Sequence, residues 1–219
     1  FKSAMIKKII LALTLIVSPF ISGSIQAQEG PLTLKSITNG SFGAHGIYGV
    51  NPLADGESYS QLVDGKRIVV SSFKTGEQTG VLFDADNTKG KVKVSRIDGY
   101  IMSPNQKNIL LRTQTQSIYR HSTTAVYYIY NVQNRTLAPL SDGGPQECPL
   151  WSPDGNMVGF VREGNLFLVK LLFDNAEVQI TKDGKFNSII NGKADWVYEE
   201  EFVTNRSFDF NADATMLAW

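Results

Sequence analysis

Short apolar runs, separated by clusters of polar turn residues, make up most of this chain. Within the runs apolar and β-branched residues dominate, and helical spacing is almost absent after the N-terminal region. This pattern is typical of β-strands joined by turns, and it predicts an all-β protein. The predicted strands are residues 59–63, 67–71, 92–94, 109–111, 125–130, 157–161, 166–169 and 178–180.

The clearest hairpin in the pattern joins residues 59–63 to residues 67–71. Asp64 and Gly65 lie between the two runs, and both residue types tolerate the positive φ that a type I′ turn requires. We therefore expect a tight reversal at these two positions.

One sequence motif recurs at intervals of about 50 residues, a period that is typical of β-propeller blades. Its best copy is WSPDGNMVGF at 151–160, preceded by MSPNQKNILL at 102–111 and VNPLADGESY at 50–59. A weaker copy, FNADATMLAW, occupies 210–219. In each copy a strand ends, a polar turn reverses the chain and an apolar strand begins, as proline and Asp-Gly favour.

With about four strands per repeat, the chain is predicted to form a partial β-propeller of about four blades. A β-sandwich is the rival architecture, but it has no reason to repeat one turn at this spacing. Because the chain stops at Trp219 inside an apolar run, we expect it to be the front part of a longer protein.

The N-terminal region has the features of a secretory signal peptide. Lys2, Lys7 and Lys8 precede a short apolar run at 9–17, and small residues end at Ala27. The run is too short to span a bilayer comfortably, although a membrane anchor stays open as the alternative. We predict a signal peptide at 1–27, the propeller portion at 28–219, and an exported protein of the periplasm or cell envelope.

Charge and cysteine content narrow the function classes. The 21 basic and 21 acidic residues balance, so no overall field attracts nucleic acid. Cys148 is the single cysteine, which excludes an intrachain disulfide. It lacks a histidine or aspartate setting, and we predict a small buried thiol rather than a nucleophile.

The residues 195–202 (DWVYEEEF) form the most unusual stretch of the chain, because three consecutive carboxylates follow two large aromatic residues. Asp195 is a good helix N-cap, and carboxylates near a helix start are favoured by the helix dipole. The stretch therefore predicts a short helix inserted between propeller strands. The carboxylates then either complement the helix dipole or converge on a cationic group such as an ammonium.

A metal site is the other use of such a cluster, but no spaced Asp/Asn ligands of a calcium loop lie nearby. We expect no metal and no cofactor. Upstream, Arg120 and His121 precede the strand at 125–130 and should lie on a loop or strand entrance. Local sequence alone assigns neither a function, since such residues are commonly solvated or structural.

The stretch NGKADWVYEEE at 191–201 resembles the double-glutamate motif of the dipeptidyl peptidase IV family of serine peptidases. YRHS at 119–122, followed by YYIY at 127–130, resembles the arginine segment of that family, and the WSPDG repeat fits its propeller. The resemblance covers about residues 32–219. It implies an eight-bladed propeller that covers an α/β-hydrolase domain.

The resemblance also implies roles for particular residues. Glu200 and Glu201 would hold the free N-terminal ammonium of a peptide, and Arg120 would bind the carbonyl of its penultimate residue. Glu199, Tyr198 and His121 would support these residues without touching the substrate. Such an arrangement measures two residues from the amino terminus and implies release of X-Pro or X-Ala dipeptides.

The sequence contains no Gly-x-Ser-x-Gly nucleophile motif, so the catalytic α/β-hydrolase domain is expected to be absent and this chain inactive alone. The expected partners are peptides with a free N-terminus, the hydrolase domain, and a second copy in a homodimer of the full-length form. Two alternatives stay open: a non-enzymatic periplasmic propeller that binds proteins, and a related tripeptidyl peptidase.

Overall fold

The computed structural model describes residues 32–42 and 48–219, which belong to two compact units, Phe1–Gly46 and Ile47–Trp219. The predicted signal peptide at 1–27 lies outside the described residues. In the first unit α2 (Leu34–Thr38) begins with a capping box, in which Thr33 and Ser36 each accept a hydrogen bond from the other's backbone amide. No helix in the described part is long and apolar enough to cross a membrane.

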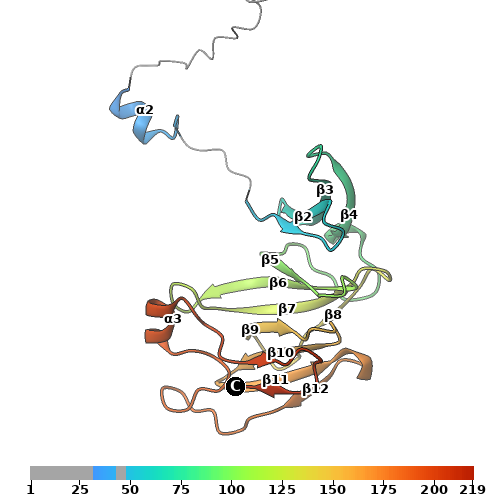
Figure 1. Ribbon diagram of the computed structural model, residues 1–219, viewed down its shortest axis with the longest axis vertical. Coiled ribbons are helices and arrows are strands. Elements are labelled where there is room, and N and C mark those ends of the chain that lie inside the picture. Colours follow the sequence, from blue (N-terminus) through green and yellow to red (C-terminus); the bar gives the residue numbers. More distant parts are fainter. Residues whose placement is uncertain (1–31, 43–47) are drawn as a thin grey trace, which may run out of the picture. The chain divides into compact units, whose positions relative to one another are not determined.

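The second unit consists of antiparallel sheets, which confirms the all-β prediction (Figure 1). Its strands fall into successive groups that we call blades 1, 2 and 3, followed by a two-stranded hairpin. Blade 1 contains β1 (Asn51–Pro52), β2 (Ser58–Val63), β3 (Arg67–Ser72) and β4 (Gln78–Asp84). Blade 2 contains β5 (Gly99–Met102), β6 (Asn108–Ser117), β7 (Thr123–Asn131) and β8 (Thr136–Pro139). Blade 3 contains β9 (Gln146–Trp151), β10 (Met157–Arg162), β11 (Asn165–Lys170) and β12 (Ala176–Gln179), and the hairpin is β13 (Asp209–Phe210) with β14 (Leu217–Ala218). Short 3-10 turns, η2 (Ala85–Asn87) and η3 (Leu171–Phe173), follow β4 and β11.

Each repeat of the sequence motif connects the first strand of a blade to the second. In blade 3, the Ser152 amide donates to the Met157 carbonyl at 2.9 Å, and the Ser152 hydroxyl donates to Asp154. Gly155 supplies the positive φ of 72° that closes the turn. The same backbone frame recurs at positions 53–58, 103–108 and 211–216, which confirms the predicted repeat.

The cores lie between neighbouring blades, as a propeller requires. Ile109, Leu110 and Leu111 of β6 are all fully buried, although successive side chains of a strand point to opposite faces. Ile109 and Leu111 pack with Ile68 and Phe83 of blade 1, and Leu110 packs in the cluster that contains Phe160 of blade 3. Blade 2 is therefore covered on both faces.

Blades 2 and 3 also share backbone pairing. The start of β7 pairs with β9 through Thr124↔Glu147 and Ala125↔Gln146, while its end pairs with β8. The strands of blades 2 and 3 therefore form one continuous hydrogen-bonded sheet (Figure 1).

The strand predicted at residues 92–94 is wrong. This segment is an irregular connection between η2 and β5, without ladder pairing. Val94 is buried and Val92 packs beside it in the core between blades 1 and 2, which explains the apolar pattern. The alternation of apolar and polar residues correctly indicated that the segment is buried, but a buried segment need not pair with a neighbouring strand. By contrast, the hairpin at 59–71 is confirmed, with φ of 54° at Asp64 and 65° at Gly65.

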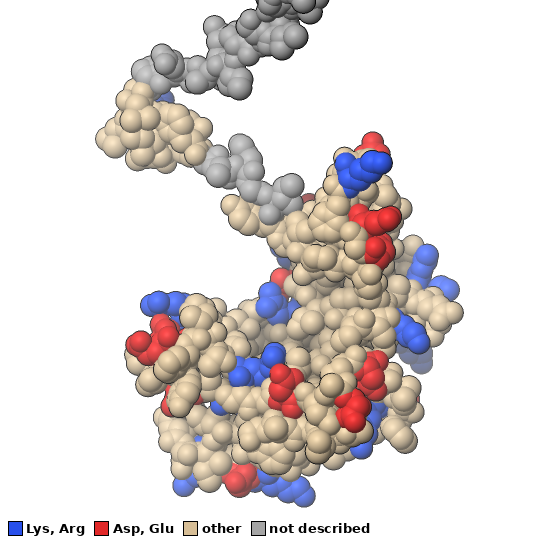
Figure 2. Space-filling model, in the orientation of Figure 1, with Lys and Arg blue, Asp and Glu red and all other residues tan. Residues whose placement is uncertain are grey.

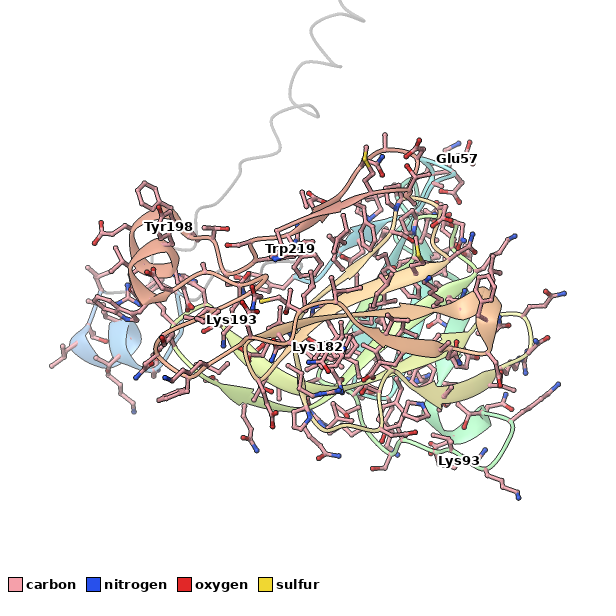
Figure 3. The ribbon with its side chains drawn as sticks, turned by 90° about the horizontal axis from the view of Figure 1, so that it is seen from below. Glu57, Lys93, Lys182, Lys193, Tyr198 and Trp219 are labelled. Atoms are coloured by element: carbon pink, nitrogen blue, oxygen red, sulfur yellow. The ribbon has the colours of Figure 1, made fainter. Side chains whose placement is uncertain are left out.

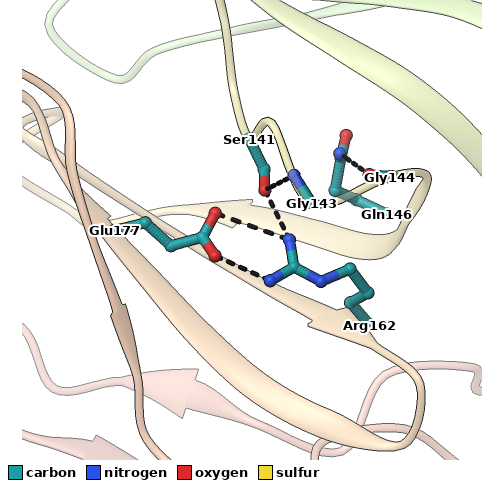
Figure 4. A network of polar contacts seen from close by, with 6 residues as sticks. All are labelled: Ser141, Gly143, Gly144, Gln146, Arg162 and Glu177. Carbon is teal, nitrogen blue, oxygen red and sulfur yellow. Dashed lines mark hydrogen bonds and ion pairs between the residues drawn. The ribbon is translucent and has the colours of Figure 1, made fainter.

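A polar network braces the edge of blade 3 (Figure 4). Arg162 of β10 pairs with Glu177 of β12 at 2.7 Å and also donates to the hydroxyl of Ser141. Its guanidinium lies 4.1 Å from the ring centre of Phe167. These contacts connect the β8–β9 loop to the outer strand of the blade.

Candidate functional site

The acidic stretch forms α3 (Trp196–Phe202), which lies on the connection between β12 and β13. The carboxylate of Asp195 accepts a hydrogen bond from the Tyr198 amide at 3.0 Å, so the predicted N-cap and the short helix are confirmed. The helix ends at Val203, whose φ of 56° is left-handed. At its base, Lys193 and Arg206 form an isolated antiparallel bridge that closes the insertion.

The arginine segment occupies the loop 118–122 between β6 and β7, as predicted for a loop or strand entrance. The Ile118 amide donates to the Ser122 carbonyl at 3.0 Å and so closes the loop. The loop lies against α3, which approaches from a position far along the sequence (Figure 1). The fold therefore brings the two sequence motifs together.

Glu199 makes the contact between α3 and this loop. Its side chain is only 2% exposed, and one carboxylate oxygen accepts hydrogen bonds from the amides of His121 at 2.7 Å and Ser122 at 2.8 Å. Burial raises the pKa of Glu199, but the hydrogen bonds from Ser122 and His121 outweigh it and the pKa is lowered. Glu199 is therefore an ionised structural group.

Glu200 faces Arg120. One guanidinium nitrogen of Arg120 lies 3.4 Å from a carboxylate oxygen of Glu200. The Arg120 side chain is 73% exposed and the Glu200 side chain is 15% exposed, so the pair is open to solvent on one side. An ion pair that is this open to solvent contributes little to stability.

The three glutamates of α3 have three different surroundings, because neighbouring residues of a helix do not share a face. Glu199 is buried, Glu200 is half-buried and Glu201 is exposed. On the face shown in Figure 2, acidic and basic side chains lie next to each other over this helix. Arg120 and Glu200 therefore lie together at the surface, and the exposed Glu201 is the next residue along the helix.

Tyr198 and His121 belong to the two sequence motifs that the fold brings together, but their surroundings differ from those of the accessible Glu200 and Glu201. Tyr198 is 58% exposed, and its ring packs against Phe202 at 5.5 Å on a helix that stands out from the strands (Figure 3). His121 is exposed, and its backbone amide and carbonyl are what bind the α3 segment. The contribution of His121 that the structure shows is therefore made through its backbone.

Asn205 is a site residue that sequence analysis missed. It follows α3, and its side-chain amide donates to the carbonyl of His121 at 3.2 Å. The backbone carbonyl of Asn205 accepts hydrogen bonds from the Ala194 amide at 3.2 Å and from the Cys148 thiol at 3.1 Å. A lone asparagine in a polar stretch carries no sequence signal for these contacts.

The residues beneath the insertion are also tied to blade 3. Lys193 pairs with Glu147 of β9 at 2.7 Å, with both side chains mostly buried. Burial raises the pKa of the Cys148 thiol to about 12, so the thiol stays protonated, and nearby Glu147 adds to the rise. These features match the predicted unreactive cysteine.

A cleft with a volume of about 980 Å³ opens on the other side of α3, between the helix and the loop at 184–190. Glu199, Ser122 and Trp196 line it, whereas Arg120, Glu200 and Glu201 do not. The hydroxyl of Ser122 is buried there without a hydrogen-bond partner in the described structure. Among residues 32–42 and 48–219, no group of three His, Cys, Asp or Glu side chains could hold a metal ion.

Comparison with known proteins connects this geometry to a family. Residues 103–219, more than half of the chain, match the family described as the dipeptidyl peptidase IV (DPP IV) N-terminal region. The crystal structure of Porphyromonas gingivalis dipeptidyl peptidase 4 superposes with a TM-score of 0.77 and 38% identity, covering 86% of this chain and 27% of that protein.

Two curated relatives have similar coverage. The probable dipeptidyl-aminopeptidase B of Talaromyces stipitatus is 36% identical over 188 residues, which is 78% of this chain and 20% of that protein. The human prolyl endopeptidase FAP is 32% identical over 176 residues, which is 80% of this chain and 22% of that protein. The chain thus spans about a fifth of the length of these relatives.

The repeated blades, with an acidic helix on a blade-to-blade connection, define the class of this chain as a β-propeller domain. Within that class, the chain belongs to the dipeptidyl peptidase IV family and carries sequence of its N-terminal region.

Proposed function

We propose that this chain is the substrate-recognition portion of an exported serine dipeptidyl peptidase that releases X-Pro or X-Ala dipeptides. The observation that carries the proposal is the placement of Arg120 within 3.4 Å of Glu200, beside the accessible Glu201. Opposite charges gathered at an open surface fit a ligand that has both an ammonium and a neighbouring carbonyl.

The chemistry of each group suits one part of a peptide terminus. An ammonium has three N–H donors, which two carboxylates and one further acceptor can satisfy. Glu200 and Glu201 supply the carboxylates, and Arg120 supplies N–H donors for the carbonyl of the penultimate residue. Because Glu200 already pairs with Arg120, the incoming ammonium would share the carboxylate that orients the guanidinium.

Cleavage itself requires groups that this sequence does not contain, since it has no Gly-x-Ser-x-Gly motif. In the proposed enzyme, a hydrolase-domain serine attacks the peptide carbonyl, the C–N bond breaks, and the rest of the peptide leaves as a free amine. Water then hydrolyses the acyl-enzyme ester and releases the dipeptide. The role of this chain is to place the scissile bond two residues from the bound terminus. Export to the periplasm or cell envelope, contact with a hydrolase domain and a homodimer belong to the same proposal.

The direct test removes each carboxylate charge in the full-length enzyme. Glu200→Gln and Glu201→Gln should each lower kcat/KM for an X-Pro reporter peptide by about 10- to 100-fold, since each removes a charged hydrogen bond to the ammonium. Glu77→Gln, at an exposed position in blade 1, is the matched control and should leave kcat/KM unchanged. Unchanged kinetics in both α3 variants would sink the proposal.

A second arm changes the substrate instead of the protein. Acetylation of the peptide amino group removes its charge and two of its donors, so turnover should be abolished. Efficient cleavage of the acetylated peptide would instead indicate an endopeptidase, the activity in the name of the human relative. Release of tripeptides would favour the tripeptidyl alternative, and binding without cleavage would favour a non-enzymatic propeller.

A further inference from the structure

The loop that carries Arg120 is held to the α3 segment from two sides. From one side the buried carboxylate of Glu199 accepts the amides of His121 and Ser122. From the other side the side-chain amide of Asn205 donates to the backbone carbonyl of His121 at 3.2 Å. Both backbone polar groups of His121, the residue directly after Arg120, are therefore bound by the α3 segment.

This arrangement matters because the Arg120 side chain has few contacts of its own. It is 73% exposed, and its pairing with Glu200 at 3.4 Å is long and solvated. A long exposed side chain loses conformational freedom when it binds a ligand, and a loop whose backbone is already fixed avoids the further cost of being ordered at the same time. The direction in which Arg120 leaves the loop is thus set by the peptide groups on either side of His121.

Asn205 is itself anchored independently of the loop. Its carbonyl accepts from the thiol of Cys148 in β9 and from the amide of Ala194 at the base of the insertion. The side-chain amide consequently projects from a fixed main chain toward His121. An asparagine suits this position because a carboxylate of the same shape could not donate to a carbonyl.

We propose that Asn205 is a positioning residue for substrate binding: it orients the loop so that Arg120 meets the same ligand as Glu200. This inference rests on the proposed function, in which Arg120 binds a substrate carbonyl. Asn205 does not touch the substrate and acts only through the loop.

The first experiment is a kinetic cycle in the full-length enzyme. Asn205→Ala should raise KM for an X-Pro reporter peptide by about three- to tenfold and change kcat less than about twofold, because substrate binding is lost equally in the ground and transition states. In an Arg120→Ala background, Asn205→Ala should add no further change in KM. Equal effects of Asn205→Ala in both backgrounds would overturn the positioning role.

The second experiment measures the loop without reference to activity. Hydrogen exchange at the amides of His121 and Ser122 in this chain should speed up in Asn205→Ala and in the isosteric Asn205→Asp, which serves also if the alanine variant does not fold. Asn134→Ala, at an exposed residue of the β7–β8 turn, is the control and should leave both amides protected. Unchanged exchange in both Asn205 variants would refute the inference.

The two experiments separate this inference from the proposed function. If Glu200→Gln and Glu201→Gln leave kcat/KM unchanged, the proposed function fails, and the positioning role of Asn205 fails with it. If those variants impair catalysis while Asn205→Ala leaves KM unchanged, only the positioning role fails.

Discussion

Glu199, Glu200 and Glu201 show that identical neighbouring side chains can have unrelated roles. The helix rotates each one into different surroundings, from the buried contact of Glu199 to the open position of Glu201. Glu199 connects α3 to the loop 118–122, which carries Arg120 and which we call the arginine loop, while Glu200 and Glu201 remain accessible. The family resemblance implies a supporting role for Glu199, and its burial and its two backbone donors favour a structural role.

The ionisation of Glu199 couples stability to pH. Its folded-state pKa is lowered from the ordinary value of 4.5, so its stabilising effect is complete above that pH and is lost as the pH falls below it. Glu199→Gln should therefore reduce the free energy of unfolding of this chain by about 1–3 kcal/mol at neutral pH, with the difference shrinking in acid.

Urea unfolding of both proteins at neutral pH and at successively lower pH values measures this difference. The matched variant Glu201→Gln changes the exposed neighbour and should show no comparable loss. If the difference in free energy of unfolding between wild type and Glu199→Gln stays constant down to strongly acidic pH, Glu199 does not stabilise the fold through its ionised carboxylate.

At the scale of elements, the repeated turn forms the same hydrogen bonds in each blade and also connects neighbouring blades. The side chain of Asn105 in the blade 2 turn donates to the carbonyl of Asp154 in the blade 3 turn at 2.8 Å. Asn105 also accepts hydrogen bonds from Ser103 and from the Lys107 amide, so it cannot move aside freely. The turn motif thus stabilises both a blade and its junction with the next.

Substitution of two glycines distinguishes the backbone conformation of the turn from the contact between neighbouring turns. Gly56 and Gly155 have nearly equal positive φ, 69° and 72°, but a Cβ on Gly56 meets nothing within 4 Å, whereas one on Gly155 meets Asn105 at 2.5 Å. Gly56→Ala should cost about 1 kcal/mol from backbone strain alone. Gly155→Ala should cost about 1–2 kcal/mol more, because the neighbouring turn must shift.

Thermal or chemical unfolding of the two alanine variants checks this difference directly. Equal destabilisation would mean that the contact between the turns of blades 2 and 3 contributes nothing to stability.

At the scale of the whole second unit, polar side chains on the first strands of blades 2 and 3 connect to the preceding blade. The indole of Trp151 in blade 3 donates to the carbonyl of Ile101 in blade 2 at 3.1 Å. One blade earlier, the hydroxyl of Tyr100 donates to the fully buried Ser60 at 2.8 Å and accepts from Asn51 at 2.9 Å. These side-chain hydrogen bonds complement the apolar layers between blades.

Tyr100→Phe removes both hydrogen bonds while it keeps the ring. It should lower the free energy of unfolding by about 1–2 kcal/mol, because the buried Ser60 loses a partner. Tyr59→Phe is the control: the Tyr59 ring packs against Phe73, and its hydroxyl forms no hydrogen bond with the residues that the structure describes. A destabilisation no larger than that of the control would contradict a role for Tyr100 between blades.

Local patterns in the sequence determined the strands, the repeated turn and the short acidic helix of this protein. Proline restricts φ, whereas Asp and Gly tolerate the left-handed φ of the turn, and Asp195 caps a helix that begins one residue later, so neither the turn nor the helix depends on distant contacts. The same local signals misassigned residues 92–94, where apolar side chains pack in the core without a pairing strand.

Only the tertiary structure decided which of the three glutamates is buried, that Asn205 holds the arginine loop, and that Arg120 lies beside Glu200. Each of these facts depends on contacts between residues about 80 positions apart, such as the hydrogen bond from His121 to Glu199. Hydrogen bonding to a distant backbone amide leaves no periodicity or propensity in the sequence around either partner. The sequence therefore determined which elements form. The packing of α3 against the β6–β7 loop decided which of their side chains are buried, which hold the loop and which remain accessible.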